Sequence, residues 1–363
     1  GGHARRRQRP RRGDPHMSRR ALVTGATGGL GLALVAALVE AGYAVRASGR
    51  KPEALERLRA MGAEPFGGDL LDQTDAACPD IDVVFHAAAL SSPWGPDADF
   101  ELANVELTRR LLAAARRAGV DGFIFVSSPS VFARWGDQTG LTEDSPPNPK
   151  PLNAYSRTKG EAERLVRAAD APGFRTVSLR PRAIIGPDDA VLLPRILKLV
   201  KKGRFPLFRG GKALVELTDS RDAARAFLLA DQHRETAGGQ VVNITSGRPL
   251  PISDLVRRLG ETLGVEVRIV PLPLALGQVL SVASEAISRL SPGQPGPVLT
   301  PYTLSTLAWS QTFDLSGAKR LIDYEPLHDA VATAMVMAPE LAKRAWAGAG
   351  STSCAPGPVR IRR

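Results

Sequence analysis

The stretch from Ala21 to Gly42 constrains the fold more than any other part of this chain. It holds a run of small and apolar residues, a turn with Gly25, Gly28 and Gly31, and an apolar helical segment that stops at Gly42. Glycines at this spacing let the backbone turn tightly, let a pyrophosphate approach the amides, and let a helix pack on a strand. We therefore expect a strand, a turn and a helix of an α/β protein with a doubly wound parallel sheet. A glycine-rich turn in some other α/β protein is the alternative.

The next predicted strand, at 44–48, ends at Gly49, and Arg50 and Lys51 follow. About 20 residues after such a turn, NAD-binding proteins usually carry an acid that hydrogen-bonds the ribose 2′-hydroxyl. Its absence at Gly49, beside two cations, leaves space and charge for a 2′-phosphate. The pattern favours NADP, with NAD possible, unless the two cations only solvate the start of the next helix.

Two further strands end in residues that suit the rest of such a cofactor. Asp69 and Leu70 close a third short strand, where the acid can hydrogen-bond the adenine edge. The run 81–89 is a fourth strand ending in three alanines, Ala87 to Ala89. Side chains this small let the backbone lie against a bound cofactor.

Tyr155 and Lys159 stand four residues apart in a segment that follows a Pro-rich loop. On a helix they share one face, so the ammonium can stabilise the phenolate. Acid/base work near neutral pH needs the tyrosine pKa to fall by roughly 3 units from about 10, which is about 4 kcal/mol. The spacing alone is common on helix surfaces, and the glycine turn is what favours a catalytic role.

Hydroxyl groups gather at the end of the predicted strand that begins at Gly122. Because ligands bind at the carboxyl ends of parallel strands, we expect Ser128 to hydrogen-bond a substrate oxygen. Ser127 and Ser130 compete for this role. Alternatively, all three cap the strand and bond nearby backbone groups.

With these residues in this order, the chain resembles the extended branch of the short-chain dehydrogenase/reductase superfamily, from about Ala21 to about Pro339. It is most similar to the 3β-hydroxysteroid dehydrogenase-type enzymes, which include sterol-carboxylate dehydrogenases and 2-alkyl-3-oxoalkanoate reductases. The closest local matches lie at 91–95, 127–131 and 311–314. The resemblance implies a Rossmann-type sheet with a smaller C-terminal substrate domain, and the catalytic residues Ser128, Tyr155 and Lys159.

The resemblance also implies a domain division and a cofactor site. The nucleotide domain covers 21–180, with 219–230 packing back on it, and the substrate domain covers 181–345. The implied cofactor-binding residues are Gly25, Thr27, Gly28, Gly29, Leu30, Gly31, Arg50, Asp69, Leu70, Ala87, Ala88, Ala89, Lys159 and Pro181.

Nucleotide-sugar epimerases and dehydratases are the alternative within this branch. The dehydratases carry two acids after the central strand, whereas 128–130 is Ser-Pro-Ser, so dehydration is disfavoured. The sugar-nucleotide enzymes tend to place an Asn before a Gly-Pro corner, and 183–185 offers no amide.

Trp94, Phe132 and Trp135 are expected to border the substrate together with Ser130, and their aromatic faces favour an apolar ligand. For each ring, burial in the core is the alternative.

The net charge of +11 does not describe the catalytic body. Eight Arg against one Asp in residues 1–20, and three Arg in the last fourteen residues, account for ten of these charges. We expect a disordered basic leader at 1–20, a disordered tail at 346–363, and no nucleic-acid face. Two cysteines without metal spacing fit a reducing cytoplasm and predict no metal site.

The segment 272–290 is apolar but interrupted, and it reads as a packed helix, a substrate lid or a helix in weak contact with a membrane surface.

Taken together, the sequence predicts a cytoplasmic, NADP-preferring oxidoreductase, a monomer or homodimer, that interconverts a hydrophobic secondary alcohol and its ketone. A nucleotide-sugar epimerase is one alternative, and a protein that binds NADP without turnover, as a sensor or scaffold, is another.

Overall fold

The computed structural model describes residues 18–347. The predicted disordered segments 1–20 and 346–363 lie mostly outside this range, and their inner ends need correction. Arg20 is the first residue of a central strand. At the other end, Trp346 belongs to the last helix, where its indole Nε1 donates to the Leu197 carbonyl at 3.1 Å.

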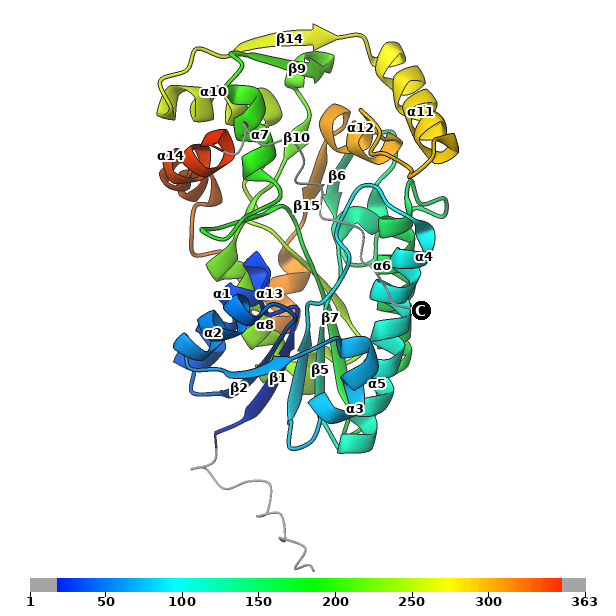
Figure 1. Ribbon diagram of the computed structural model, residues 1–363, viewed down its shortest axis with the longest axis vertical. Helices are drawn as coiled ribbons and strands as arrows, with labels where there is room; N and C mark the ends of the chain where they lie inside the picture. Colours follow the sequence, from blue (N-terminus) through cyan, green and yellow to red (C-terminus); the bar gives the residue numbers. More distant parts are fainter. Residues whose placement is uncertain (1–17, 348–363) are drawn as a thin grey trace, which may run out of the picture.

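Seven parallel strands form the central sheet in the order β12-β7-β5-β4-β1-β2-β3 (Figure 1). They are β1 (Arg20–Thr24), β2 (Ala44–Gly49), β3 (Glu64–Gly67), β4 (Val83–His86), β5 (Gly122–Val126), β7 (Arg175–Pro181) and β12 (Val241–Ile244). Strands buried on both faces read as continuous apolar runs, as in the predicted strand after residue 20. The predicted doubly wound Rossmann-type sheet is confirmed. Because β12 completes it, the sheet extends beyond the predicted boundary at residue 180.

Helices cover both faces of the sheet (Figure 1). One face packs against α1 (Gly29–Glu40), α2 (Pro52–Ala60), α8 (Ser220–Gln232), α9 (Arg234–Ala237) and α13 (Ser316–Ile322). The other lies under α3 (Leu70–Ala77), α5 (Leu107–Ala118) and α6 (Ala154–Ala168), which α4 (Asp97–Phe100) and the π-helix η1 (Glu101–Glu106) adjoin. Both faces of the sheet are therefore closed to water, and its strand ends remain as places for a ligand.

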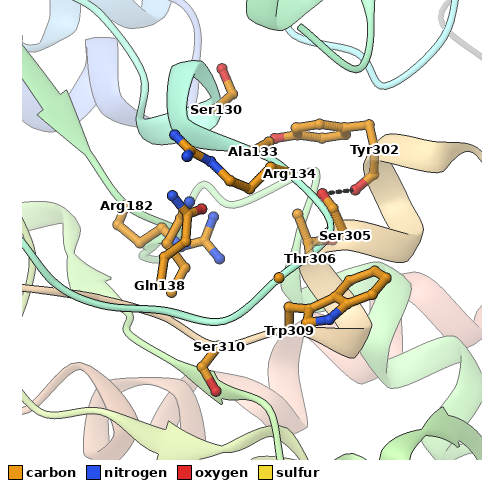
Figure 2. A pocket seen from close by; sticks show the side chains of 12 residues that line it. Ser130, Ala133, Arg134, Gln138, Arg182, Tyr302, Ser305, Thr306, Trp309 and Ser310 are labelled. Carbon is orange, nitrogen blue, oxygen red and sulfur yellow. Dashed lines mark hydrogen bonds between the residues drawn. The ribbon is translucent and has the colours of Figure 1, made fainter. Parts of the chain in front are cut away.

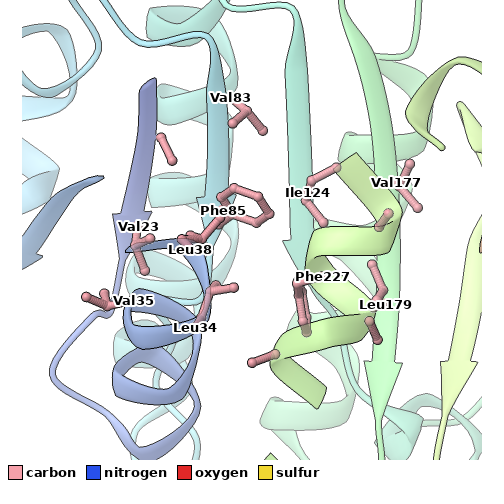
Figure 3. Packing of buried hydrophobic residues seen from close by; sticks show 14 of the residues in the cluster. Val23, Leu34, Val35, Leu38, Val83, Phe85, Ile124, Val177, Leu179 and Phe227 are labelled. Atoms are coloured by element: carbon pink, nitrogen blue, oxygen red, sulfur yellow. The ribbon is translucent and has the colours of Figure 1, made fainter. Parts of the chain in front are cut away.

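The first of these faces forms a dry core between the sheet and the pair α1 and α8 (Figure 3). Leu34 and Leu38 of α1 and Phe227 of α8 are fully buried in it. The same core contains Tyr324, near the end of the chain, whose hydroxyl donates to the Thr245 carbonyl at 3.0 Å. The nucleotide half is thus assembled from three separate parts of the sequence.

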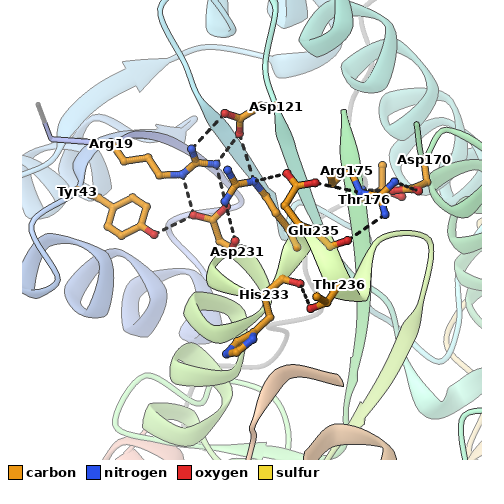
Figure 4. Close-up of polar contacts among 11 residues, drawn as sticks. Arg19, Tyr43, Asp121, Asp170, Arg175, Thr176, Asp231, His233, Glu235 and Thr236 are labelled. Atoms are coloured by element: carbon orange, nitrogen blue, oxygen red, sulfur yellow. Dashed lines mark hydrogen bonds and ion pairs between the residues drawn. The ribbon is translucent and has the colours of Figure 1, made fainter. Parts of the chain in front are cut away.

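A charged cluster closes the amino ends of the strands (Figure 4). Arg19, just before β1, donates to Asp121, just before β5, and to Asp231 at the end of α8. The Tyr43 hydroxyl donates to the same Asp231 carboxylate at 2.8 Å. Asp231 is almost fully buried, and Arg234 donates to it as well, at 3.4 Å, so three side chains share this carboxylate and hold this edge of the sheet as a unit.

The C-terminal half has its own core, formed chiefly by α7 (Leu193–Val200), α10 (Ile252–Thr262) and α14 (Ala330–Ala347). Four two-stranded sheets surround it: β6 (Gln138–Leu141) with β15 (Gln311–Phe313), β8 (Ile184–Ile185) with β11 (Thr218–Asp219), β9 (Arg204–Phe208) with β14 (Arg268–Leu272), and β10 (Leu214–Val215) with β13 (Leu250–Pro251). The short 3-10 helix η3 (Arg209–Gly211) and helix α12 (Pro301–Ala308) complete this half, whereas the 3-10 helix η2 (Pro129–Phe132) follows β5 and packs against α6.

Helix α11 (Leu274–Leu290) lies at the edge of the C-terminal half (Figure 1). Several of its apolar side chains face solvent, among them Val279 (68% exposed), Ile287 (65%) and Leu290 (88%). On its other side α11 packs against α12, with Gly277, Ser281 and Ser288 buried. The interpretations of 272–290 as a packed helix, a substrate lid or a membrane-surface helix therefore stay predictions. Within residues 18–347, no helix combines the length and apolar character that crossing a bilayer requires.

Candidate active site

A cleft of about 1320 Å³ lies between the carboxyl ends of the sheet strands and the C-terminal half. Residues from both halves line it, so one end of the cleft is formed by the nucleotide half and the other end by the C-terminal half. The predicted residues on its wall are Gly25, Thr27, Gly28, Gly29, Leu30, Gly31, Arg50, Asp69, Leu70, Ala87, Ala88, Ala89, Ser128, Ser130, Tyr155, Lys159 and Pro181.

Two positions of the glycine turn between β1 and α1 have no room for a side chain. Gly25 has a left-handed φ of +65°, and a Cβ there would lie 2.7 Å from the Ala88 nitrogen. A Cβ on Gly31 would lie 2.2 Å from the Gly25 carbonyl oxygen. Gly28 is the N-cap of α1 and brings no side chain to the helix terminus. Free amides at a helix N-terminus, in a cradle that a side chain would fill, fit the pyrophosphate of a dinucleotide.

The end of β2 gives a second reason for the missing acid at Gly49. A Cβ on this residue would lie 2.8 Å from the Thr27 methyl carbon, so packing also favours glycine. Arg50 is exposed on the cleft wall. The Asp69 carboxylate accepts from the Leu71 amide at 3.0 Å and caps α3, and the residue lines the cleft.

Tyr155 and Lys159 lie one turn apart on α6, which Asn153 caps by accepting from the Ser156 amide at 2.9 Å. Lys159 is only 2% exposed, and its Nζ donates to the Val126 carbonyl at 2.7 Å. Burial lowers the pKa of Lys159 to about 7, and the Glu163 carboxylate opposes this shift. The ammonium is thus held at the end of β5, beside the cleft.

The three serines after β5 differ in what they contact. Ser127 donates to Glu163 at 2.6 Å, so its proton is already engaged. The Ser128 oxygen accepts from the Ser130 amide at 3.2 Å, which leaves its hydroxyl proton free to face the cleft. The Ser130 hydroxyl is buried without a partner among the described residues. Of the three, Ser128 and Ser130 can serve a ligand.

Sequence reasoning missed Asn104, which is buried within η1. Its side chain accepts from the Leu90 amide at 2.7 Å and donates to the Thr158 hydroxyl at 3.0 Å. It therefore ties the loop after β4 to the helix that carries Tyr155. A π-helical turn often marks a functional site, but Asn104 lies between Glu101 and Glu106 in the sequence, and no local pattern singled it out.

Trp94, Phe132 and Trp135, which were expected to border the substrate, do not line the cleft. Phe132 is fully buried in a cluster with Phe313, and it forms no part of the cleft wall. Trp135 stacks on Trp309 with ring centroids 5.9 Å apart, and Trp94 donates to the Gln294 carbonyl at 3.1 Å. Of the four predicted substrate residues, only Ser130 lines the cleft.

Apolar side chains of the C-terminal half line the far end of the cleft. They come from α7, β9, α10, α11 and α12 and the segments between them: Leu192, Ile196, Leu199, Phe205, Phe208, Val215, Leu217, Ile252, Leu255, Val256, Leu272, Leu280, Val298, Leu299 and Leu307. A wall of this kind stabilises an apolar ligand by about 25 cal/mol per Å² of buried surface. Polar side chains line the cleft as well, and those of Ser130, Arg182 and Tyr302 also border a narrow side pocket (Figure 2).

Residues 21–245 match the model of the NAD dependent epimerase/dehydratase family. The chain belongs to this family. A 4-hydroxy-2-methyl-3-oxo-4-farnesyl-3,4-dihydroquinoline-1-oxide ketoreductase of Stigmatella aurantiaca is 36% identical over 77% of this chain and 84% of its own length. A 2-alkyl-3-oxoalkanoate reductase of Stenotrophomonas maltophilia is 33% identical over 84% of this chain and 94% of its own.

Other relatives in this epimerase/dehydratase family include a sterol-4-alpha-carboxylate 3-dehydrogenase and a 3 beta-hydroxysteroid dehydrogenase/isomerase. A solved structure of MoeE5 in complex with UDP-glucuronic acid and NAD superposes with a TM-score of 0.70, covering 90% of this chain and 99% of that one. At 24% identity this likeness shows the fold alone. The predicted branch is confirmed, and so is the prediction of a nicotinamide-dependent oxidoreductase of this family.

Proposed function

We propose that this protein is an NADP-preferring oxidoreductase that interconverts a hydrophobic secondary alcohol and its ketone with Ser128, Tyr155 and Lys159. The observation that carries the proposal is the position of these three side chains. They line the middle of one cleft, between a glycine cradle that fits a dinucleotide and a wall of apolar side chains.

The chain's own groups would handle the substrate oxygen and its proton. In reduction, the Ser128 and Tyr155 hydroxyls donate hydrogen bonds to the carbonyl oxygen, and Tyr155 then transfers its proton to that oxygen. The Lys159 ammonium stabilises the phenolate that remains. When bound, the nicotinamide supplies the hydride to the carbonyl carbon. Oxidation reverses each step, so the alcohol loses one hydride and one proton.

The NADP preference rests on the end of β2. Arg50 stands on the cleft wall where a 2′-phosphate would lie, and no acid occupies position 49 to repel it. The crowding of Gly49 against Thr27 weakens this argument in part, because a glycine is required there for packing as well. Arg50 is therefore the decisive residue for the choice between NADP and NAD.

The nucleotide-sugar epimerase is the second candidate, and the fold supports it as well as it supports the first. The far end of the cleft argues against it, because a sugar diphosphate needs many donors and this wall offers apolar side chains. Two relatives named as reductases of ketone substrates also support the first candidate.

A cofactor-binding protein without turnover is the third candidate. A weak membrane-surface contact through 272–290 and a monomeric or homodimeric state stay predictions.

A substrate screen with both cofactors tests the proposal. We expect NADPH consumption with bulky alkyl or alicyclic 3-keto compounds, with kcat/KM rising as apolar bulk is added, and neither binding nor conversion of UDP-sugars. Epimerisation of a UDP-sugar without activity on any hydrophobic ketone would reverse the order of the two enzymes. NADPH binding without turnover of either class would support the sensor or scaffold.

A further inference from the structure

Glu163 lies on α6, one helical turn after Lys159 and two after Tyr155, and its side chain is buried. Its two oxygens accept hydrogen bonds from outside α6. The Ser127 hydroxyl donates to Oε2 at 2.6 Å, and the Arg180 guanidinium of β7 donates to Oε2 at 2.8 Å and to Oε1 at 2.5 Å. Since residues four apart share one face of a helix, this carboxylate continues the face that carries the catalytic pair.

Contacts from α6 hold the chain directly before Ser128. The Lys159 Nζ donates to the Val126 carbonyl at 2.7 Å, and the next residue, Ser127, is the one that donates to Glu163. After Ser127 the chain leaves β5 and enters the 3-10 helix η2. The helix that bears the proposed proton donor therefore fixes the residues that lead into the serine.

A further contact acts on the chain after Ser128. Phe132, the last residue of η2, is fully buried, and the Arg180 guanidinium lies over its ring at 4.7 Å from the centroid. Arg180 is itself buried and paired with Glu163. The Glu163 carboxylate is thus linked to the chain on both sides of the serine, directly on one side and through the arginine on the other.

Net stability alone does not explain the Glu163–Arg180 pair. A buried ion pair adds little stability compared with apolar side chains of the same size, because both charges lose their hydration. A fully bonded polar network does specify one arrangement of the parts that it joins. Here those parts are α6, β7 and the segment after β5, and each brings a residue to the cleft wall, namely Tyr155, Pro181 and Ser128.

We propose that Glu163 is a positioning residue that holds Ser128 at a fixed distance from Tyr155. It acts through Ser127 and Arg180, because its own side chain is buried and forms no part of the cleft wall. The inference rests on the proposed function, in which both hydroxyls donate to one substrate oxygen. Donors of this kind depend on close geometry, so loss of the contacts should affect turnover and leave cofactor affinity unchanged.

The Ser127→Ala variant tests this role, because it removes one contact to the carboxylate and leaves the ion pair with Arg180. With NADPH and 2-decalone, a bulky alicyclic ketone, we expect kcat to fall by about 10-fold to 100-fold, since a displacement of about 1 Å can cost about 10²-fold. The Kd for NADPH should match that of the wild type. The matched control is Ser178→Ala, since Ser178 is fully buried on β7 and its hydroxyl has no partner among residues 18–347. This control should keep the wild-type kcat.

Two variants of the carboxylate grade the effect. Glu163→Gln keeps one acceptor oxygen and should retain more of kcat than Glu163→Met, which keeps none. Melting curves verify folding, because either change leaves the buried Arg180 without a countercharge. Where these variants do not fold, Ser127→Ala decides alone. A wild-type kcat in Ser127→Ala would overturn the positioning role.

Hydrogen exchange in the NADP-loaded protein separates failure of this inference from failure of the proposed function. In Ser127→Ala, the amides of 128–133 should exchange faster than in the wild type and in Ser178→Ala. Unchanged exchange would overturn the positioning role whatever the value of kcat, and reduction of the ketone would then still support the oxidoreductase. Faster exchange in a protein whose wild type reduces no ketone of the screen would support the hold on this segment and overturn the function.

Discussion

The two ends of the cleft are built by opposite means. At the cofactor end, the glycine turn excludes side chains at two positions, because a Cβ on Gly25 or Gly31 would collide with neighbouring main-chain atoms. At the substrate end, the wall consists mainly of apolar side chains, together with Arg182, whose buried Nε has no partner among residues 18–347. Gly25 and Gly31 therefore do not accept a side chain unless the turn moves. The shape of a wall of side chains changes with each substitution, so we expect substrate choice to depend on the second end.

Tyr155 stands between the two ends, and its variant has the largest expected effect. Tyr155→Phe removes only the hydroxyl, so turnover should fall by about 10²-fold or more while NADP affinity stays nearly unchanged. Steady-state kinetics on an identified ketone and a separate cofactor titration give the two readouts. Turnover close to that of the wild type would exclude Tyr155 as the proton donor.

A single methyl group added to the glycine turn tests whether this part of the cofactor end is rigid. Gly31→Ala should weaken NADPH binding by about tenfold or more, because overpacking typically costs about 1–3 kcal/mol. Gly160→Ala is the matched control, since its Cβ would meet the Val131 side chain at an ordinary 3.6 Å. That variant should bind NADPH as the wild type does. Wild-type affinity in Gly31→Ala would show that the turn can give way.

The Arg50→Ala variant tests whether the cofactor end of the cleft prefers NADPH to NADH. Arg50→Ala should weaken NADPH by roughly tenfold to a hundredfold and NADH much less, because only the first has a 2′-phosphate. Titrations with both cofactors measure the difference. Equal losses would remove the 2′-phosphate contact. Gly49→Asp is a poorer probe, because its Cβ would press on Thr27.

The smallest expected effect is a pH dependence of stability from Lys159. Its pKa falls from 10.5 to about 7 on burial, so between these pH values the unfolded chain holds a proton that the folded protein has lost. Stability of the cofactor-free protein therefore rises with pH in this window, by at most about 1.4 kcal/mol per pH unit, and the full penalty applies below it. Lys159→Met removes this contribution. Urea unfolding at pH 7.5 and 8.5 should change the difference between the two proteins by about 1 kcal/mol, and parallel behaviour would contradict the shift.

Sequence spacing was sufficient for the parts of the site that are local. The glycine turn and the Tyr155–Lys159 pair each lie within one strand, turn or helix, so their geometry follows from a few neighbouring residues. Asn104 and Arg182 were missed because their roles depend on what surrounds them in space. Asn104 bridges residues 14 and 54 positions away. Arg180 is paired with the Glu163 carboxylate, whereas Arg182, two residues later, lines the cleft and has no ion-pair partner within residues 18–347.

The packing of the aromatic residues could not be predicted from the sequence either. Phe132 follows the serine strand closely, yet its ring turns into a cluster with Phe313 of β15, a partner 181 positions away in the chain that no local pattern indicates. The division at residue 180 failed for the same reason, because β12 and Tyr324 return to the first core from far along the chain.

That return of the chain has a consequence for folding. A chain growing on the ribosome has made the glycine turn, Tyr155 and Lys159 long before it has made β12, and Tyr324 comes later still. Until then the sheet lacks its edge strand, and the core between the sheet, α1 and α8 lacks the Tyr324 side chain. Such long-range contacts slow folding and expose unpaired edges. The cofactor half is thus an early part of the sequence that becomes stable only once nearly the whole chain has been synthesised.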